Sequence, residues 1–381
     1  MANNWQDCKN ILCVRPDNMG DLIMTGPALR ALKESFGCKI TVLTSSMAAG
    51  VAKLMPEIDE IMIFDVPWVK NRLAPDPEIF NETTKKIGEK KFDAAIIFTV
   101  YSQNPLPTVM LAYLAGIPKR LAYCRENPYQ LLTEWVPDQE PYTLIKHQVR
   151  RDLDLVASIG AVTCYDKLEL NVNHTLKDKI SHTLADLGIE LQHPWLIFHP
   201  GVSEVKREYP VEQWAAAGRQ LISKGYQIVI TGAGVERDLC EQLGLRIGTG
   251  SFNSAGLFSP DAFVTLISMA PVVVSVNTGT VHIAVAVGTP VVVLYALTNP
   301  QHTPWKVPCK VLPFQVAASA QSKNEVIRHV NHFLYSERVN MPDGIAVACA
   351  VEELLNEEDA VSFADAIIWS PVHTPFQNRA D

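Results

Sequence analysis

The sequence contains few charged residues. Lysine, arginine, aspartate and glutamate make up 19% of its 381 residues, compared with about 25% in an ordinary soluble protein. The 33 basic and 41 acidic side chains leave a net charge of −8. This balance argues against a non-specific nucleic-acid binder, which needs a basic surface to neutralise phosphates. A small anionic ligand is still compatible with the composition, because a few cations and backbone N–H groups are enough to bind it.

The shortage of charge is concentrated in residues 262–305, which contain no Asp, Glu, Lys or Arg. A membrane-spanning helix needs about 20 consecutive apolar residues. Pro271 and the polar segments 277–280 and 288–290 divide this stretch into shorter apolar runs. We therefore expect buried strands and helices of a soluble domain here, rather than a membrane span.

Paired cysteines are also missing. The eight cysteines include no CxxC pair and no Cys/His cluster at the spacing of metal ligands, so we expect neither a disulfide framework nor a metal site. The only early apolar run, Ile11 to Val14, is four residues long and is followed by Arg15, which does not predict an export signal. Together these features predict free thiols in a reducing cytoplasm.

Short β-branched runs alternate with amphipathic segments in the first half of the sequence. Continuous apolar strands separated by helices are typical of a parallel sheet that is covered on both faces. The expected strands lie at residues 11–14, 39–43, 60–64 and 94–98, with a helix over 27–36.

The same pattern starts again at Trp195. Two successive series of this kind predict an α/β protein with two Rossmann-like domains whose parallel sheets face a central cleft. We expect a first domain over residues 1–172, a second over 173–337 and a C-terminal tail over 338–381 with one helix. The second series has strands at 195–198, 226–230, 272–276 and 291–295, and helices over 211–223, over 260–269 and after Thr278.

In open α/β sheets, ligands bind beyond the carboxyl ends of the strands, so the loops there are the candidate functional segments. The first, Arg15 to Asp21, lacks the GxGxxG fingerprint of dinucleotide binding. It offers instead Asp17 and Asp21 where a general base would face the cleft, and Gly20 would allow a tight turn beside a ligand. An Asp before a helix can equally be an N-cap, and the spacing alone does not separate these interpretations.

The second candidate loop, His199 to Pro210, carries the adjacent cations Lys206 and Arg207 just before a helix that begins with a proline. Cations at this edge would hold an anionic group, and an arginine–phosphate contact is among the stronger polar contacts. The alternative is that both are ordinary solvated loop residues.

The third candidate loop, residues 275–282, joins a buried strand to a helix within four residues. The N–H groups of residues 279–281 would point out of the helix N-terminus, where the macrodipole favours an anion such as a diphosphate. Asn277 or Thr278 could equally be a plain N-cap, and His282 a hydrogen-bonded core residue.

The three loops, in this order, resemble the motifs of glycosyltransferase family 9, which includes the ADP-heptose:lipopolysaccharide heptosyltransferases. The resemblance extends from residues 15–32 (RPDNMGDLIMTGPALRAL) to about Pro308. In that family, the early Gly-Asp pair carries the catalytic carboxylate. The pair corresponds here to Gly20 and Asp21, so the resemblance implies that Asp21 is the catalytic base.

The resemblance also assigns the cations of the second loop. The family has a basic residue three positions before a Trp-Pro or similar pair, which corresponds to Arg207 because Tyr209 and Pro210 stand for that pair. Lys206 is the adjacent alternative. Both are implied to bind the donor diphosphate.

The family motif Asp-Thr-Gly-x-x-His-x-Ala appears here as residues 277–284 (NTGTVHIA). Two departures stand out, since Asn277 replaces the usual Asp and residues 295–298 (YALT) replace the common Phe-Gly-x-Thr. The first removes one negative charge beside the diphosphate and keeps a cap. The resemblance assigns Thr278, Gly279 and Thr280 to the donor diphosphate, with Asn277 and His282 in support.

The nucleoside of the donor is implied to lie near two further segments. Residues 232–236 (GAGVE) resemble the family's Gly-x-x-x-Glu segment. This resemblance implies that Glu236 binds the ribose hydroxyls. Leu257 and Phe258, just before the next helix, would lie near the base.

The resemblance implies a GT-B fold with the acceptor on the first domain and the nucleotide sugar on the second. It implies an inverting, metal-independent transferase that moves a heptose or hexose from a nucleoside-diphosphate sugar, most simply an ADP-sugar, to a glycan or lipid-linked acceptor, as in lipopolysaccharide core synthesis. No cofactor is expected, and nucleic acid is not a partner. The alternatives are a nucleotide-sugar-binding protein without transfer activity, which the Asn277 departure motivates, and a sugar-nucleotide epimerase on the same fold.

The acceptor is the least determined partner. Arg120, with Lys70, Arg72 and Arg125, lies on expected loops of the first half and could meet phosphates of a lipid-linked acceptor, although surface solvation is the more common role for any one of them. We expect a cytoplasmic, bacterial monomer with at most peripheral contact at the inner face of the inner membrane. The helix of the tail 338–381 is expected to pack back on the first domain, as in other two-domain transferases.

Overall fold

The computed structural model describes residues 4–69, 76–356 and 366–370. The chain forms two compact units, Met1–Leu168 with Asp365–Asp381, and Glu169–Ala364. The division after Leu168 comes four residues before the expected boundary at residue 172. Each unit has its own six-stranded sheet and its own buried apolar core, so each can be described by itself.

The sheet of the first unit has the strand order β3-β2-β1-β4-β5-β6, and all of its neighbouring strands are parallel. The order reverses between β1 and β4, which is the point where open α/β sheets bind ligands. The strands are β1 (Asn10–Arg15), β2 (Lys39–Thr44), β3 (Glu60–Ile63), β4 (Ala94–Ile97), β5 (Lys119–Cys124) and β6 (Glu134–Pro137).

Helix α1 (Met19–Phe36) begins eight residues earlier than expected from Pro27, which lies inside the helix. Proline lacks an N–H group and usually marks the first turn of a helix. Here the turns on both sides of it are buried in the core, Leu22 to Met24 before it and Ala28 and Leu29 after it, and this burial offsets the lost hydrogen bond. The other helices of this unit are α2 (Ala49–Ala52), α3 (Pro77–Glu89), α4 (Leu106–Leu114) and α5 (Gln148–Ala157).

The sheet of the second unit repeats the same arrangement, with the order β10-β9-β8-β11-β12-β13 and parallel pairing throughout. The order reverses between β8 and β11. The strands are β8 (Trp195–His199), β9 (Gln227–Ile230), β10 (Ser251–Asn253), β11 (Val273–Val276), β12 (Val291–Ala296) and β13 (Cys309–Phe314).

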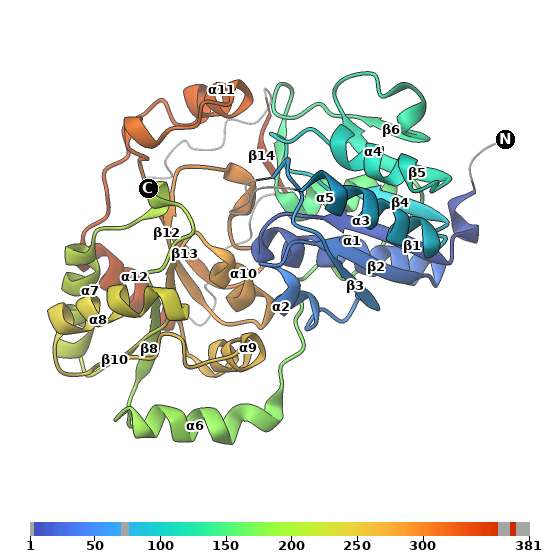
Figure 1. Ribbon diagram of the computed structural model, residues 1–381. Helices are drawn as coiled ribbons and strands as arrows, with labels where there is room; N and C mark the ends of the chain where they lie inside the picture. Colours follow the sequence, from blue (N-terminus) through green and yellow to red (C-terminus); the bar gives the residue numbers. More distant parts are fainter. Residues whose placement is uncertain (1–3, 70–75, 357–365, 371–381) are drawn as a thin grey trace. The chain divides into compact units, whose positions relative to one another are not determined.

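Helices cover both faces of the second sheet (Figure 1). Helices α7 (Val211–Ser223), α8 (Arg237–Ile247) and α12 (Gly344–Asn356) pack together, and α6 (Lys177–Asp186), α9 (Pro260–Met269) and α10 (Gly279–Ala286) form a second group. Alternate strand residues such as Leu196 and Phe198 of β8 share one core with α7 and α12, as the period of two in a strand requires. Helix α11 (Glu325–Leu334) follows β13.

The uncharged stretch 262–305 forms most of α9 and all of β11, α10 and β12. The buried interior of this unit explains why the stretch contains no charge. In the part of the chain that the structure describes, no helix is both long and apolar enough to cross a membrane.

The C-terminal tail is divided between the two units, which differs from the expectation that its helix packs on the first domain. Helix α12 packs against α7 in the second unit, where its apolar side chains Val347, Val351 and Leu354 join the core. The short strand β14 (Ile367–Trp369) pairs antiparallel with β7 (Ile145–Lys146) of the first unit. Residues 357–365 and 371–381 lie outside the described part of the chain.

A substitution of Gly344 tests the packing of α12. A Cβ at this position would lie 2.6 Å from both the Cβ of Ala216 and the backbone nitrogen of Ala217, so α12 would have to move away from α7. We expect Gly344→Ala to lower the free energy of unfolding by about 1–3 kcal/mol, measured by urea denaturation. The control is Gly234→Ala, whose Cβ would meet no atom within 4 Å, with an expected change below about 0.5 kcal/mol. Equal stability of the two variants would contradict this packing.

Candidate active site

The first candidate half-site lies at the carboxyl end of β1, in the unit that contains Asp21. Strand β1 ends with Arg15, whose side chain is only 1% exposed. Its Nε lies 3.2 Å from Oδ2 of Asp17, and its Nη2 donates a hydrogen bond of 3.1 Å to Oδ1 of Asp21. The structure therefore brings the two predicted carboxylates together around one guanidinium group that the sequence analysis did not single out.

The start of α1 decides between the two interpretations of these aspartates. The N-cap residue is Asn18, which makes no side-chain capping hydrogen bond, so neither Asp17 nor Asp21 is the cap. Asp21 is the third residue of the helix, where the macrodipole favours a negative charge. Gly20 lies within the same first turn, without a positive φ, so the expected tight turn at Gly20 is not formed.

Two further residues hold Asp17 in place. Its Oδ1 accepts a hydrogen bond from Nε2 of Gln103, in the loop after β4, and its carbonyl oxygen accepts a bond of 2.6 Å from Oγ of Ser45. Burial raises the pKa of Asp17 from its ordinary value of 3.8 to about 6, although Arg15 acts in the opposite direction. Sequence spacing gives no signal for Gln103, which lies 86 positions from Asp17.

A third carboxylate, Asp152 of α5, is buried beside this group. Its Oδ1 accepts from Nε2 of Gln148 at 2.7 Å, and its Oδ2 accepts from Oγ1 of Thr25 at 2.8 Å. Burial raises the pKa of Asp152 from 3.8 to about 6. For Arg15, burial acts to lower the pKa, but the neighbouring carboxylates Asp17, Asp152 and Asp21 outweigh it and raise the pKa.

The environment of Arg120 does not support the predicted acceptor contact. Its guanidinium donates to the carbonyl oxygens of Leu131 at 2.6 Å, Gln130 at 3.0 Å and Ile117, and it lies over the ring of Tyr113. The side chain is buried and ties loops of the first unit together.

Among the other predicted acceptor cations, Arg125 is also held by backbone carbonyl groups. Arg125 donates to the carbonyl oxygens of Glu140 and Tyr101, and its side chain is 25% exposed. Lys70 and Arg72 lie outside the described residues.

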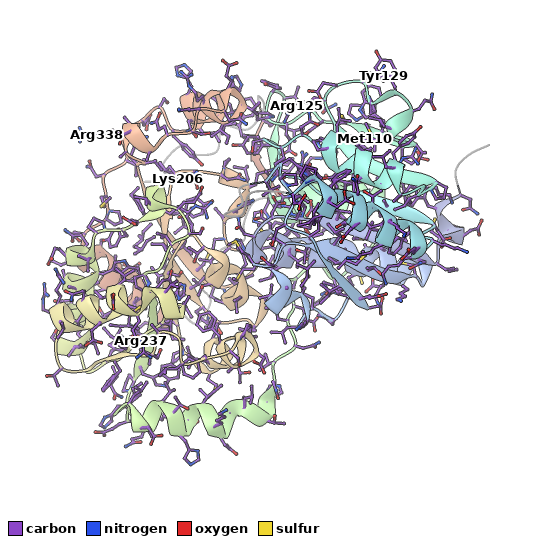
Figure 2. The ribbon with its side chains drawn as sticks, viewed as in Figure 1. Met110, Arg125, Tyr129, Lys206, Arg237 and Arg338 are labelled. Atoms are coloured by element: carbon purple, nitrogen blue, oxygen red, sulfur yellow. The ribbon has the colours of Figure 1, made fainter. Side chains whose placement is uncertain are left out.

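The second candidate half-site lies at the carboxyl ends of β8 and β11. Lys206 and Arg207 are in a single helical turn after β8, and Figure 2 labels Lys206 there. Arg207 Nη1 donates a 3.0 Å hydrogen bond to the carbonyl oxygen of Asn277, which directly follows β11. Oε2 of Glu204, which the sequence analysis missed, lies 3.2 Å from Nζ of Lys206 and 3.4 Å from Nη2 of Arg207. Arg207 is therefore held beside the start of α10, and Glu204 joins Lys206 to it.

The Asn277 side chain joins the ends of two strands. Its Nδ2 donates to the carbonyl oxygen of Ala296 at 3.1 Å and to Oγ1 of Thr298 at 3.2 Å, and its Oδ1 accepts from the N–H of Ala296 at 3.2 Å. A carboxylate has no hydrogen to donate to the Ala296 oxygen. The Asn277 amide therefore makes a hydrogen bond to Ala296 that the ionised Asp usual in family 9 could not make.

Helix α10 begins directly after Thr278, which is its N-cap and makes no side-chain capping bond. The N–H groups of Gly279 and Thr280, at the first two helical positions, have no carbonyl partner within the helix. The N–H of Val281 instead donates to the carbonyl oxygen of Thr278 at 3.2 Å, so the expectation that it points outward with the other two is wrong. His282 is buried in the helix, with its ring edge-on to His302 at 6.3 Å.

Glu236 reaches the same edge of the sheet from the loop after β9. Its Oε2 accepts from the N–H of Ala233 at 2.7 Å, and its carboxyl group lies against Gly201, where an added Cβ would come within 2.2 Å of Oε1. The sequence analysis missed Gly201, although a glycine directly after a strand signals a close approach of this kind.

The loop after β10 lies beside the loop after β9. The N–H of Gly256 donates to the carbonyl oxygen of Gly232 at 2.9 Å. This contact brings Leu257, which is 43% exposed, and the half-buried Phe258 to the edge that carries Glu236. The predicted nucleoside residues are therefore gathered within one unit.

His199, the last residue of β8, is a further polar group at this edge that sequence reasoning missed. Its Nδ1 is 2.9 Å from Oγ1 of Thr231, and burial lowers its pKa to about 4. The imidazole is therefore neutral at neutral pH. Among residues 4–69, 76–356 and 366–370, no three His, Cys, Asp or Glu side chains gather at the spacing of metal ligands.

A substitution at Asn277 tests whether its amide is required. In Asn277→Asp, an ionised carboxylate would face the Ala296 carbonyl oxygen, whereas a protonated one could still donate to it. We expect the variant to lose about 1–3 kcal/mol of stability at pH 8 and less at pH 5, measured by urea denaturation. A loss that does not grow with pH would show that the amide hydrogen is not the reason for Asn at this position.

The pH dependence of stability tests the buried carboxylate of Asp152. Because its pKa is raised to about 6, the native state holds more protons than the unfolded state between about pH 4 and 6, so this group makes stability fall as pH rises through that range. The free energy of unfolding of Asp152→Asn minus that of the unmodified protein should therefore increase between pH 4 and 7. The expected increase is on the order of 3 kcal/mol. Parallel pH curves for the two proteins would contradict the raised pKa.

Comparisons with known proteins show the family to which the chain belongs. The family model for glycosyltransferase family 9 (heptosyltransferase) matches residues 81–331, more than half of the chain. This range includes the loops after β8, β9 and β11 but not the loop after β1. Among curated relatives, lipopolysaccharide heptosyltransferase 2 of Escherichia coli K12 is 25% identical over 308 residues, which cover 77% of this chain and 84% of the relative.

Solved structures are similar over almost the whole chain. A glycosyltransferase of family 9 from Veillonella parvula has a TM-score of 0.74 at 19% identity. The aligned region covers 91% of this chain and 97% of the Veillonella chain. The E. coli ADP-heptose LPS heptosyltransferase II has a TM-score of 0.69 at 22% identity, with coverages of 92% and 100%. At these identities the likeness shows the fold, and it confirms the expected GT-B type. Together with the family match, it establishes that the chain belongs to glycosyltransferase family 9 and is a glycosyltransferase.

Proposed function

We propose that this glycosyltransferase moves a heptose, or a related hexose, from an ADP-sugar to the core of lipopolysaccharide, with inversion and without a metal ion. The E. coli relative is a lipopolysaccharide heptosyltransferase and the structural neighbour is an ADP-heptose LPS heptosyltransferase, which suggests the sugar, the nucleotide and the acceptor. The observation that carries the proposal is the presence in one chain of two candidate groups, a carboxylate held by a guanidinium in the first unit and an arginine beside a helix N-terminus in the second.

Asp21 is the base in this proposal. A sugar hydroxyl is a weak nucleophile, and a positioned carboxylate that takes its proton accelerates attack by about 10²–10⁴-fold. The hydrogen bond from Arg15 Nη2 to Oδ1 favours the ionised carboxylate, as does the position in the first turn of α1. Asp21 is 7% exposed, so little water competes with the acceptor hydroxyl for it.

The departing diphosphate is stabilised by the second unit. The N–H groups of Gly279 and Thr280 at the start of α10 bind its oxygens, with Thr278 beside them. Arg207 and Lys206 supply positive charge, which Glu204 keeps in place. Within the described part of the chain, the buried Nε of Arg207 has no hydrogen-bond partner, which leaves a donor for a phosphate oxygen.

Glu236 binds the ribose in this proposal. Its Oε2 already accepts from Ala233, and an ionised carboxylate has further acceptor sites for ribose hydroxyls. Leu257 and Phe258 provide apolar contact for the adenine base. Gly201 is required because its missing Cβ leaves room for the carboxyl group of Glu236.

The stereochemistry follows from the proposed chemistry. If the acceptor hydroxyl attacks the sugar directly from the side opposite the diphosphate, one displacement inverts the anomeric centre. The arginine, the lysine and the α10 amides would supply the charge stabilisation that a metal ion gives in other transferases. Since lipopolysaccharide is lipid-linked, we propose a cytoplasmic monomer that touches the inner face of the inner membrane peripherally.

Two substitutions test the proposed roles. We expect Asp21→Asn to lower kcat by at least about 100-fold, because the amide cannot take a proton. Arg207→Ala should lower kcat/KM for the ADP-sugar by about 100-fold, because the leaving diphosphate loses charge stabilisation. Product formation from ADP-heptose and a heptose-deficient lipopolysaccharide acceptor would be followed by mass spectrometry.

Matched controls come from surface ion pairs in the same units. Asp154→Asn removes a carboxylate that pairs with Lys146, and Arg246→Ala removes a cation that pairs with Glu212. Both should keep kcat within about twofold. Full activity of Asp21→Asn, or loss of transfer in EDTA, would refute the base assignment or the metal independence respectively. Conversion of the donor without any acceptor would instead indicate an epimerase.

A further inference from the structure

Asp17 has no role in the proposed reaction, yet it is one of the most constrained polar side chains in the first unit. It is 5% exposed, and its contacts come from three separate segments. Gln103, after β4, donates to its Oδ1, Arg15 at the end of β1 lies against its Oδ2, and Ser45, after β2, donates to its carbonyl oxygen. An ionisable side chain buried in this way costs stability unless its partners compensate.

These contacts form a continuous path to Asp21. Gln103 binds Asp17, Asp17 lies against Nε of Arg15, and the same guanidinium donates to Asp21 through Nη2. A guanidinium group is planar and rigid, so the ion pair of Asp17 with Nε also acts on the direction in which Nη2 donates. The backbone of Arg15 is held as well, because its carbonyl oxygen accepts a 2.8 Å hydrogen bond from Oγ1 of Thr44.

We propose that Asp17 is a positioning residue, which sets the orientation of the Arg15 guanidinium and through it the orientation of the Asp21 carboxylate. This inference rests on the proposed function of Asp21 as the base. Asp17 does not touch substrate in this proposal. Its effect arises because a base that is displaced by about 1 Å can lose a factor of about 100 in rate.

Protonation of Asp17 weakens its contact with Arg15. The charged groups around it are Arg15 on β1, Asp21 on α1 and Asp152 on α5, and Gln103 is its polar neighbour. Burial raises the pKa of Asp17 to about 6, so the carboxylate that attracts Arg15 is lost as the pH falls through this value. Transfer should therefore decline on the acid side of about pH 6 even where the substrates remain bound.

The test is the effect of Asp17→Asn on kcat, KM and the pH profile. We expect kcat at pH 7.5 to fall by about 10- to 100-fold, with KM for the ADP-sugar and for the lipopolysaccharide acceptor changed by less than about threefold. In the pH profile, the decline of kcat below about pH 6, here called the acid limb, should disappear because residue 17 no longer titrates. An unchanged kcat and pH profile, or a rise in KM with unchanged kcat, would overturn the inference.

Gln103→Glu tests the same path without removing Asp17. Glutamate has nearly the shape of glutamine, and its oxygen can still accept the hydrogen bond from the N–H of Val100 that Gln103 accepts. It places a second carboxyl group against Oδ1 of Asp17, so the two must share a proton. The acid limb of kcat should move to higher pH, which a merely structural role would not cause. An unmoved limb would contradict the proposal even if Asp17→Asn failed to fold.

Glu57→Gln is the matched control for charge. It removes another buried carboxylate of the first unit, which is held by a different guanidinium because Nη2 of Arg30 donates to its Oε1, and it should keep kcat within about threefold. An equal loss in Asp17→Asn and Glu57→Gln would show that kcat falls on removal of any buried carboxylate from this unit, and would overturn positioning by Asp17.

A double substitution separates this inference from the base assignment. If Asp17 acts through Arg15, Arg15→Lys combined with Asp17→Asn should be no slower than Arg15→Lys alone, whereas additive losses would refute the path. If Asp21→Asn is inactive while Asp17→Asn is fully active, this inference fails and the proposed function stands. If Asp21→Asn is fully active, both fail.

Discussion

Both units depend on a parallel sheet that is covered by helices on its two faces. Such a sheet leaves no polar surface on its faces, so polar side chains gather at the ends of the strands. In both units the strand order reverses beside the first strand, between β1 and β4 and between β8 and β11. The two helices that follow the strands at these points, α1 and α10, begin there with N-caps that make no side-chain capping bond. The same constraint therefore produces both half-sites.

The two half-sites use opposite electrostatic arrangements. In the first unit one buried guanidinium is surrounded by three carboxylates, which is an excess of negative charge suited to accepting a proton. In the second unit two cations share one carboxylate beside a helix N-terminus, which is an excess of positive charge suited to a diphosphate. This division of charge is what a transferase needs if its base and its leaving group are held by different domains.

The sequence was sufficient to predict the two alternating series, the loops after the strands and the gathering of the candidate residues at strand ends, because these follow from local periodicity and motif order. It could not predict the partners of those residues. Arg15 is a single charge after an apolar run, and Gln103 is distant in sequence. The internal position of Pro27 and the destination of α12 were missed because tertiary burial overrides local preference. Arg120 was predicted to be a loop cation available to the acceptor. It is instead buried and donates hydrogen bonds to backbone carbonyl oxygens.

The amide of Asn277 has a consequence for how the two units respond to their surroundings. An amide does not ionise between pH 4 and 9, so the connection between the ends of β11 and β12 carries no titrating group at this position. The hydrogen bonds of Asn277 beside the N-terminus of α10 can therefore stay the same at pH values where Asp17 and Asp152 change charge. As the pH falls through about 6, the charge therefore changes at Asp17 and Asp152 of the first unit, while the hydrogen bonds of Asn277 in the second unit stay the same.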